Sequence, residues 1–333
     1  MRKSTSIFLL LAAAGLVGCP GSTTGHDSGP NPGHDSGTPA DDTGVDSGRV
    51  GMDSGPVTGT DVPIASVVNG SAADHPQDMT GLVTHVTGDL VALTPRLFQS
   101  QSQTSMRCLF AIWVGTAAGG DYSGIEVTET FLPATGNTCF TEPAHMIPDS
   151  VAIGDSITNL TGHYLNFCPS GSSCPSFTSE EIDVTNGTFT VGGHGSAPTA
   201  TMVSIADVTG QPGMPLTAGT RSLALQGALV TLTGVIQTDP PRMGSAPGGN
   251  NYVMAVAATG TTTPLMHVRV ATYGGVGCQR ATLTTLGAGG TVGNVTGVLQ
   301  YSFGQWVIVV RQSSDLPSVM CSDAGPSAPD AGV

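Results

Sequence analysis

Apolar and polar residues alternate in short runs over residues 63–200, which is the pattern of half-buried β-strands. The pattern predicts a hairpin over 80–95 turned at Thr87-Gly88-Asp89, and a second hairpin with Asn186-Gly187 at its tip. Between them we expect three further strands: 107–115, which is short and largely buried, 123–130, which alternates, and 156–167, which is bent at Gly162. A capping box from Thr178 to Glu181 predicts one turn of helix.

A second β-rich stretch follows from residue 222. We expect strands over 222–238 (one long strand or a bent pair), 252–258, 265–273 and 281–286. The last segment, 293–316, predicts a hairpin turned at Ser302-Phe303-Gly304.

The regions outside these strands have a different composition. Residues 20–62 contain no aromatic residue, Leu or Ile, and repeat Asp-Ser-Gly units, so they cannot bury enough apolar surface to offset their ordering entropy. The pattern predicts a disordered linker over 19–62 and a disordered tail over 321–333. Calcium binding by the linker aspartates is not favoured, because their spacing does not match the known loop.

The first residues carry an export signal. Two positive charges precede an apolar run from Ile7 to Val17, too short to span about 30 Å of hydrocarbon as a helix. Leu16-Val17-Gly18-Cys19 resembles the lipobox of bacterial lipoproteins. The resemblance implies that the signal peptide, residues 1–18, is removed and that Cys19 is lipidated with acyl chains such as palmitate. The protein would then be anchored in the cell envelope, with the outer membrane or cell surface favoured. An ordinary signal peptide ending near a cysteine is the alternative.

Composition is consistent with export. After removal of residues 1–18 the chain has 8 Arg against 24 acidic residues, which disfavours a polyanionic ligand for the whole molecule. Six cysteines remain besides Cys19, and an even number in an exported chain predicts disulfides. The simplest of the fifteen pairings joins nearest neighbours: Cys108 with Cys139, Cys168 with Cys174, and Cys278 with Cys321. A zinc site is not expected, because no C-x-x-C pair is present.

The two halves of the β-rich region share a pattern. Each has a glycine, a strand ending in Thr-Gly, an aromatic-rich continuation and an acidic close, at 151–184 and 289–316. These features resemble the OB-like modules of bacterial surface lipoproteins and of secreted-nuclease accessory regions. The resemblance implies an all-β chain with two small OB-like barrels, over 63–200 and 201–320. A pair of β-sandwiches is the alternative.

One candidate ligand face lies in the second half. Residues 63–200 carry 2 Arg and 12 acidic residues, whereas 201–320 carry 5 Arg and 3 acidic residues, a net charge of +2. Aromatic side chains near those arginines would stack bases, as single-strand binders do. The face comprises Arg269, Tyr273, Tyr301, Trp306 and Arg311. Since +2 is far from a basic footprint, we expect the aromatic residues to fill the core and nucleic acid not to be a partner.

One motif suggests catalysis. "VAIGDSITNLTG" at 151–162 resembles the first block of GDSL-type hydrolases, in which Ser156 would be the nucleophile. The Asp-x-x-His block that would activate it is missing, and a nucleophile without a base is an inert hydroxyl. We therefore expect no enzyme activity, no catalytic residue, no metal and no cofactor. The expected role is non-catalytic binding of an envelope or extracellular ligand, or envelope structure.

Overall fold

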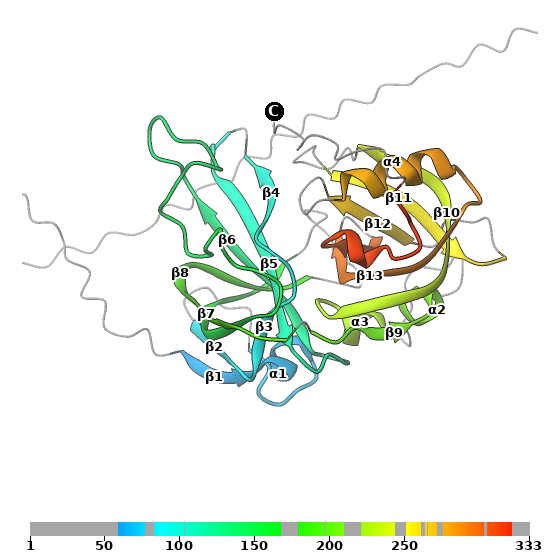
Figure 1. Ribbon diagram of the computed structural model, residues 1–333. Helices are drawn as coiled ribbons and strands as arrows, with labels where there is room; N and C mark the ends of the chain where they lie inside the picture. Colours follow the sequence, from blue (N-terminus) through cyan, green and yellow to red (C-terminus); the bar gives the residue numbers. More distant parts are fainter. Residues whose placement is uncertain are drawn as a thin grey trace, which may run out of the picture. The chain divides into compact units, whose positions relative to one another are not determined.

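A computed structural model describes most of the β-rich region (Figure 1). The described residues are 59–76, 83–102, 104–167, 179–196, 198–209, 221–243, 251–260, 264, 266–271, 276–302 and 305–321. The lipobox with Cys19, linker residues 19–58, Cys168, Cys174, Tyr273 and tail residues 322–333 lie outside them. The linker prediction was wrong at its end, because residues 60–62 form a strand and Val62 is buried. The described residues all belong to one compact unit.

The first five-stranded ring is built from residues 83–194. Its first strand is β2 (Val83–Thr87) continued by β3 (Leu90–Ala92), and the others are β5 (Cys108–Thr116), β6 (Gly124–Phe131), β7 (Asp155–Phe167) and β8 (Ser179–His194). β3 pairs with β5, β5 with β6, β6 in parallel with β8, β8 with β7, and β7 with β2 and β3. The ring therefore closes, with strand order 1-2-3-5-4.

The second ring repeats this order. It comprises β10 (Leu229–Met243), β11 (Asn251–Ala258), β12 (Met266–Ala271), β13 (Thr291–Ser302) and β14 (Gln305–Val310). β12 pairs in parallel with β14, and β10 pairs with both β11 and β13. The protein is therefore all-β with two OB-like barrels, as predicted, and closure of both rings rules out separate sandwich sheets.

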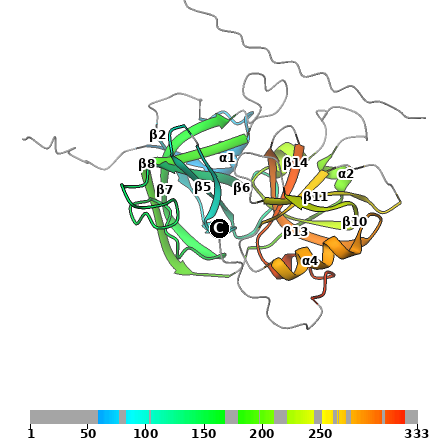
Figure 2. The same ribbon diagram turned by 90° about the horizontal axis from the view of Figure 1, so that it is seen from above.

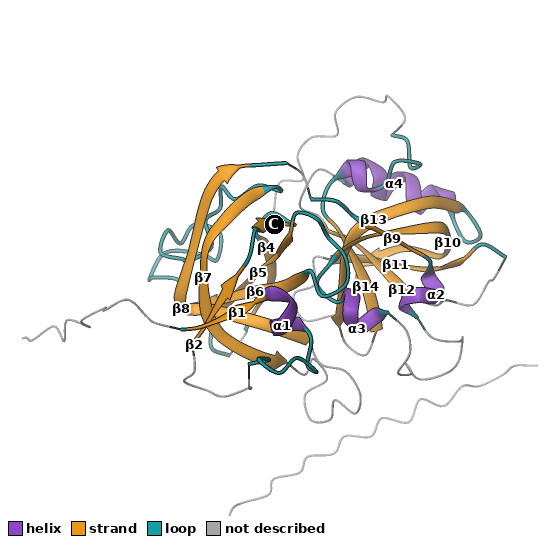
Figure 3. Cartoon of the chain, turned by 90° about the horizontal axis from the view of Figure 1, so that it is seen from below, coloured by secondary structure: helices purple, strands orange, loops and turns teal. Residues whose placement is uncertain are grey.

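Short elements surround the barrels, and Figure 3 shows how little of the chain is helical. They are β4 (Leu97–Gln101), which pairs with β5, and the helices α3 (Ser222–Leu225), α4 (Gly277–Leu286) and η1 (Ser313–Asp315). α4 contacts β10 (Figure 2), and the Gln237 side chain of β10 donates to the carbonyl oxygens of Leu283 and Gly287 at 2.9 and 2.8 Å.

Each barrel is preceded by the same small unit. β1 (Thr60–Pro63) and α1 (Ile64–Val68) come before the first, and β9 (Thr201–Val203) and α2 (Ile205–Val208) before the second. β1 runs parallel to β2, and β9 parallel to β10. The underlying letters match as V-x-I-A-x-V, at 62–67 and 203–208, and their valine and isoleucine residues are buried in both copies, whereas the alanine is exposed. This short repeat marks the start of each barrel in the sequence, in addition to the pattern shared by 151–184 and 289–316.

Strand alternation explains the two cores. On β5, Ile112 and Val114 face the interior of the first barrel, whereas Ala111 and Trp113 face outward. The outward residues meet Leu229, Val298 and Val309 of the second barrel in a separate buried cluster. The barrels are therefore in apolar contact through the outer face of β5.

Five local predictions were wrong. The strand expected over 222–238 begins only at Leu229, because residues 222–225 form α3. Thr87-Gly88-Asp89 is a bulge between β2 and β3, which both pair antiparallel to β7. The expected helical turn at 178–181 is not formed, because Ser179 starts β8, and Asn186-Gly187 lies inside that strand at a register shift, not at a hairpin tip. Residues 281–286 belong to α4, where tertiary packing overrides the weak helix propensity of threonine. The hairpin at residues 302–305 is confirmed.

Two of the three predicted disulfides are formed, and the third falls on cysteines outside the described residues. Cys108–Cys139 and Cys278–Cys321 have Cα–Cα distances of 5.6 and 5.8 Å. Cys139 and Cys278 both lie in the connection between the third and fourth strand of their barrel. These disulfides indicate an oxidising location outside the cytosol.

Candidate ligand surface on the first barrel

Four phenylalanines gather where β4, β5 and β6 meet the loop after β6. Ring centroids of Phe98 lie 5.3 Å from Phe110 and 5.0 Å from Phe140, and Phe110 stacks on Phe131 at 5.7 Å. Phe110 is buried, Phe98 and Phe131 are half-buried, and Phe140 is 60% exposed. We call these four residues the phenylalanine surface.

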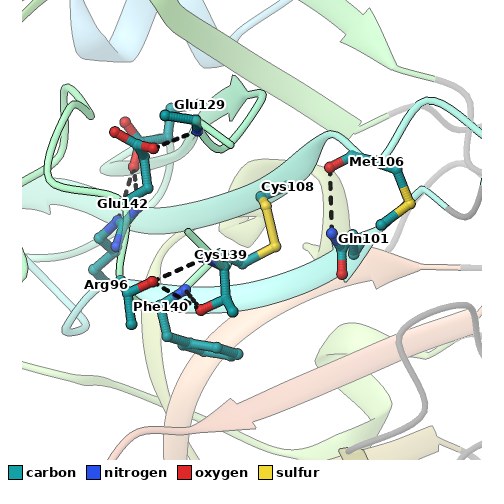
Figure 4. Close-up of a disulfide and its surroundings, with 11 residues drawn as sticks. Arg96, Gln101, Met106, Cys108, Glu129, Cys139, Phe140 and Glu142 are labelled. Atoms are coloured by element: carbon teal, nitrogen blue, oxygen red, sulfur yellow. Dashed lines mark hydrogen bonds and ion pairs between the residues drawn. A yellow bond between two sulfur atoms is a disulfide. The ribbon is translucent and has the colours of Figure 1, made fainter. Parts of the chain in front are cut away.

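The loop that presents Phe140 is tied down on both sides (Figure 4). Cys139, the preceding residue, is bonded to Cys108 of β5, and both cysteines are buried. Glu142 accepts hydrogen bonds from the backbone N–H of Ala134 at 2.6 Å and of Ala144 at 3.1 Å, and from Asn137 Nδ2 at 3.1 Å. The hydrogen bonds from Ala134, Asn137 and Ala144 lower the pKa of Glu142, so it stays ionised and keeps the loop ordered.

The buried side chain of Arg96 packs against the ring of Phe110. The Arg96 guanidinium lies 3.6 Å from the centroid of Phe110, a cation–π geometry. It forms ion pairs with Glu129 at 2.7 Å and with Asp149 at 2.5 Å. Glu129 also accepts the backbone N–H of Ile147 at 3.0 Å, which fixes the far end of the loop. The positive charge of Arg96 is therefore balanced inside the protein.

This arrangement suits one kind of ligand. An exposed phenylalanine held by covalent and ionic contacts loses little conformational entropy on binding, so it is a preorganised apolar contact. Residues 63–200 have a net charge of −10, which opposes a polyanion. The surface can hold an uncharged ring or apolar face by stacking.

Charge and motif patterns did not point to this surface, although the sequence contained a signal for it. Four of the nine phenylalanines fall between residues 98 and 140. Phe110 follows Cys108 by two residues and Phe140 follows Cys139 directly, so the predicted disulfide already required them to be close.

The residues of the candidate ligand face in the second half are largely buried, although their charges had suggested an exposed surface. Arg269 and Arg311 are 8% and 6% exposed, and Trp306 is 2% exposed in the core of the second barrel. Tyr301 is half-buried against Trp306, with ring centroids 5.2 Å apart, as the core interpretation expected. Arg311 forms an ion pair with Asp315 at 2.7 Å and donates to the Leu93 carbonyl oxygen at 3.0 Å. These residues therefore offer no exposed basic face.

Ser156 does not assemble with a base. The neighbouring Asp155 pairs with His194 Nδ1 at 2.7 Å, and the backbone N–H of Ala152 and His194 lower the pKa of Asp155. Successive side chains of a strand point to opposite faces, so Ser156 turns away from this pair and donates to the Gly193 carbonyl oxygen at 3.0 Å.

The described residues contain neither a cluster of metal-ligating side chains nor a helix of membrane-spanning length and apolarity. No three His, Cys, Asp or Glu side chains among them are grouped to hold a metal ion. None of the helices in this part of the chain has the length and apolar character needed to cross a membrane.

Comparisons with known proteins add little. No family model matches the chain, and no curated protein matches it. Among solved structures, the crystal structure of the tetrameric p202 HIN2 is similar over 70% of this chain and 94% of that chain, with 13% identity and a TM-score of 0.26. A likeness of that size carries no argument about function.

Proposed function

We propose that the chain is an exported, lipid-anchored, non-catalytic binding protein of the bacterial envelope, and that its first barrel holds a neutral ring ligand such as a sugar of an envelope or extracellular glycan. The observation that carries the proposal is Phe140, a 60% exposed ring on a loop fixed by a buried disulfide. OB barrels bind both oligonucleotides and oligosaccharides. The acidic first barrel favours the uncharged class.

Anchoring through Cys19 rests on the lipobox resemblance, with support from the two disulfides. In the native host, Cys19→Ala should lose fatty-acid labelling and pass from the membrane to the soluble fraction. Retention of the label in this variant would contradict the anchor while leaving the binding proposal intact.

The binding test uses the mature chain against an array of neutral oligosaccharides, followed by calorimetry on any ligand found. Stacking of a nucleobase ring on an aromatic side chain is worth about 1–3 kcal/mol, and a contact of that size makes Phe140→Ala weaken binding about fivefold to about 140-fold. Phe167→Ala is the matched control, because Phe167 is an exposed phenylalanine at the end of β7, outside the phenylalanine surface. Equal losses in both variants, or no ligand on the array, would refute the proposal.

A further inference from the structure

Two carboxylates lie next to each other between the barrels. Glu126 on β6 and Glu181 on β8 are Cα partners in the parallel pairing of these strands. They are only 5% and 8% exposed. Side chains in register on neighbouring strands are about 5 Å apart, and like charges there destabilise the sheet.

The second barrel supplies the groups that face Glu126. Gln300 on β13 donates from Nε2 to Glu126 Oε2 at 3.0 Å, and Arg269 on β12 lies close enough to interact with the carboxylate. Arg269 also donates from Nη1 to Gln99 Oε1 of β4 at 2.9 Å. Ser179 of the first barrel donates a further hydrogen bond to Glu126.

Negative charge exceeds positive charge in this cluster. The negative charges of Glu126, Asp183 and Glu180 act on Glu181, while Arg269 is the positive group that acts on Glu126. Asp183 lies opposite His163 of β7 in the strand pairing, and Glu180 accepts a hydrogen bond from Tyr164 Oη. Burial is the largest effect and raises the pKa of Glu126 to about 7. Burial and then the charge of Glu126 raise the pKa of Glu181 well above its usual range. Around neutral pH the two side chains therefore hold fewer than two negative charges.

We propose that contact between the two barrels is proton-linked: it is tight while the Glu126–Glu181 pair retains a proton, and it loosens when both side chains are ionised. One arginine cannot balance two adjacent buried carboxylates. The second ionised group gains water only if the barrels move apart. Ionisation and separation are therefore coupled.

The surface that separation uncovers is the outer face of β5. Trp113 is 1% exposed there and packs in the cluster with Leu229 and Val298 of the second barrel. This face belongs to the second and third strands, the face through which OB barrels bind their ligands. The second barrel thus covers the face of the first that corresponds to the binding face of other OB barrels, and pH controls how firmly it does so.

Trp113 is a direct reporter, because the chain contains only two tryptophans. In a Trp306→Phe background, acrylamide quenching of Trp113 fluorescence is measured from pH 5.5 to 8.5. The quenching constant should rise severalfold above pH 7, because Glu126 ionises with a pKa of about 7 and its charge holds the pKa of Glu181 high, so the second proton leaves at higher pH. In Glu126→Gln/Glu181→Gln, quenching should stay low throughout. Asp89→Asn, which removes an exposed carboxylate from the same barrel, should keep the rise.

Two results would overturn the proposal: quenching that is independent of pH in the parent, or an undiminished rise in the double variant. If Trp306→Phe does not fold, hydrogen exchange of β5 and β13 peptides in the otherwise unaltered chain gives the same comparison. Faster exchange at high pH, after correction for the intrinsic rate, is then the expected result, and equal protection across the range contradicts it.

Discussion

Removal of the Cys108–Cys139 bridge is the perturbation whose size follows most directly from the structure. The bridge closes a sequence separation of 31 residues. In the chain-entropy relation, a loop of that size corresponds to about 4 kcal/mol of the free energy of unfolding. Cys108→Ser/Cys139→Ser should therefore lose about 4 kcal/mol, with the burial of two hydroxyl groups adding to the loss.

The assay is urea unfolding followed by circular dichroism, comparing this variant with Cys278→Ser/Cys321→Ser. The second bridge closes 43 residues, so its removal should also cost about 4 kcal/mol. The two variants should nevertheless differ in ligand binding, because Phe140 neighbours the first bridge alone. A loss below about 1 kcal/mol in the first variant would show that Glu142 and Arg96 hold the loop without the bridge. The reasoning that the disulfide preorganises Phe140 would then be wrong.

Three further predictions concern the contact between the barrels. Burial raises the pKa of Glu126 from 4.5 to about 7, so between these pH values the folded protein holds a proton that the unfolded chain has lost. The contribution of Glu126 to the free energy of unfolding should therefore be greatest below pH 4.5 and fall by about 3 kcal/mol as the pH rises through 7. Glu126→Gln should flatten that fall in urea titrations at pH 5 and 8, and an unchanged difference would contradict the burial argument. A Cβ at Gly124 would lie 2.2 Å from the carbonyl oxygen of Gly227 in the second half of the chain, so Gly124→Ala should lower the free energy of unfolding by about 2 kcal/mol or more. Gly193→Ala is the control and should leave stability unchanged, because a Cβ there would meet no atom within 4 Å. Equal melting temperatures for these two variants would exclude the close approach. Arg311→Ala leaves Asp315 buried and unpaired and should cost about 3–5 kcal/mol in chemical denaturation, while a loss below about 1 kcal/mol would show that the pair is solvated.

Strand content was predictable because alternation is a local property. The segments 107–115, 123–130 and 156–167 correspond to β5, β6 and β7. Segment 123–130 places its apolar side chains on one face at a period of two, whereas 107–115 is a continuous apolar run that is buried on both faces. Which strands pair with each other was less predictable. Residues 80–95 carry a turn signal that a hairpin and a bulge share, and only pairing with β7 decides for the bulge.

Among the candidate site residues, the disulfide pairings were predictable from the sequence, whereas the exposure of the arginines was not. The pairings of Cys108 and Cys278 followed from even cysteine number and proximity in sequence. Charge counting selected Arg269 and Arg311 as a ligand face, yet both are buried at contacts with residues of the first barrel. Composition records that a charge exists and contains no information on whether a distant segment covers it.

The amino-acid sequence alone determined that this chain forms strands, has an even set of cysteines for an oxidising location, and concentrates acid in its first half, because each depends on residue type and short-range order. Tertiary structure alone decided which surfaces remain open. Phe140 is exposed and Trp113 is covered, and Glu126 meets Glu181 from a strand more than fifty positions away. Exposure and pKa depend on neighbours that are distant in sequence, so they exist only once the barrels have closed and met.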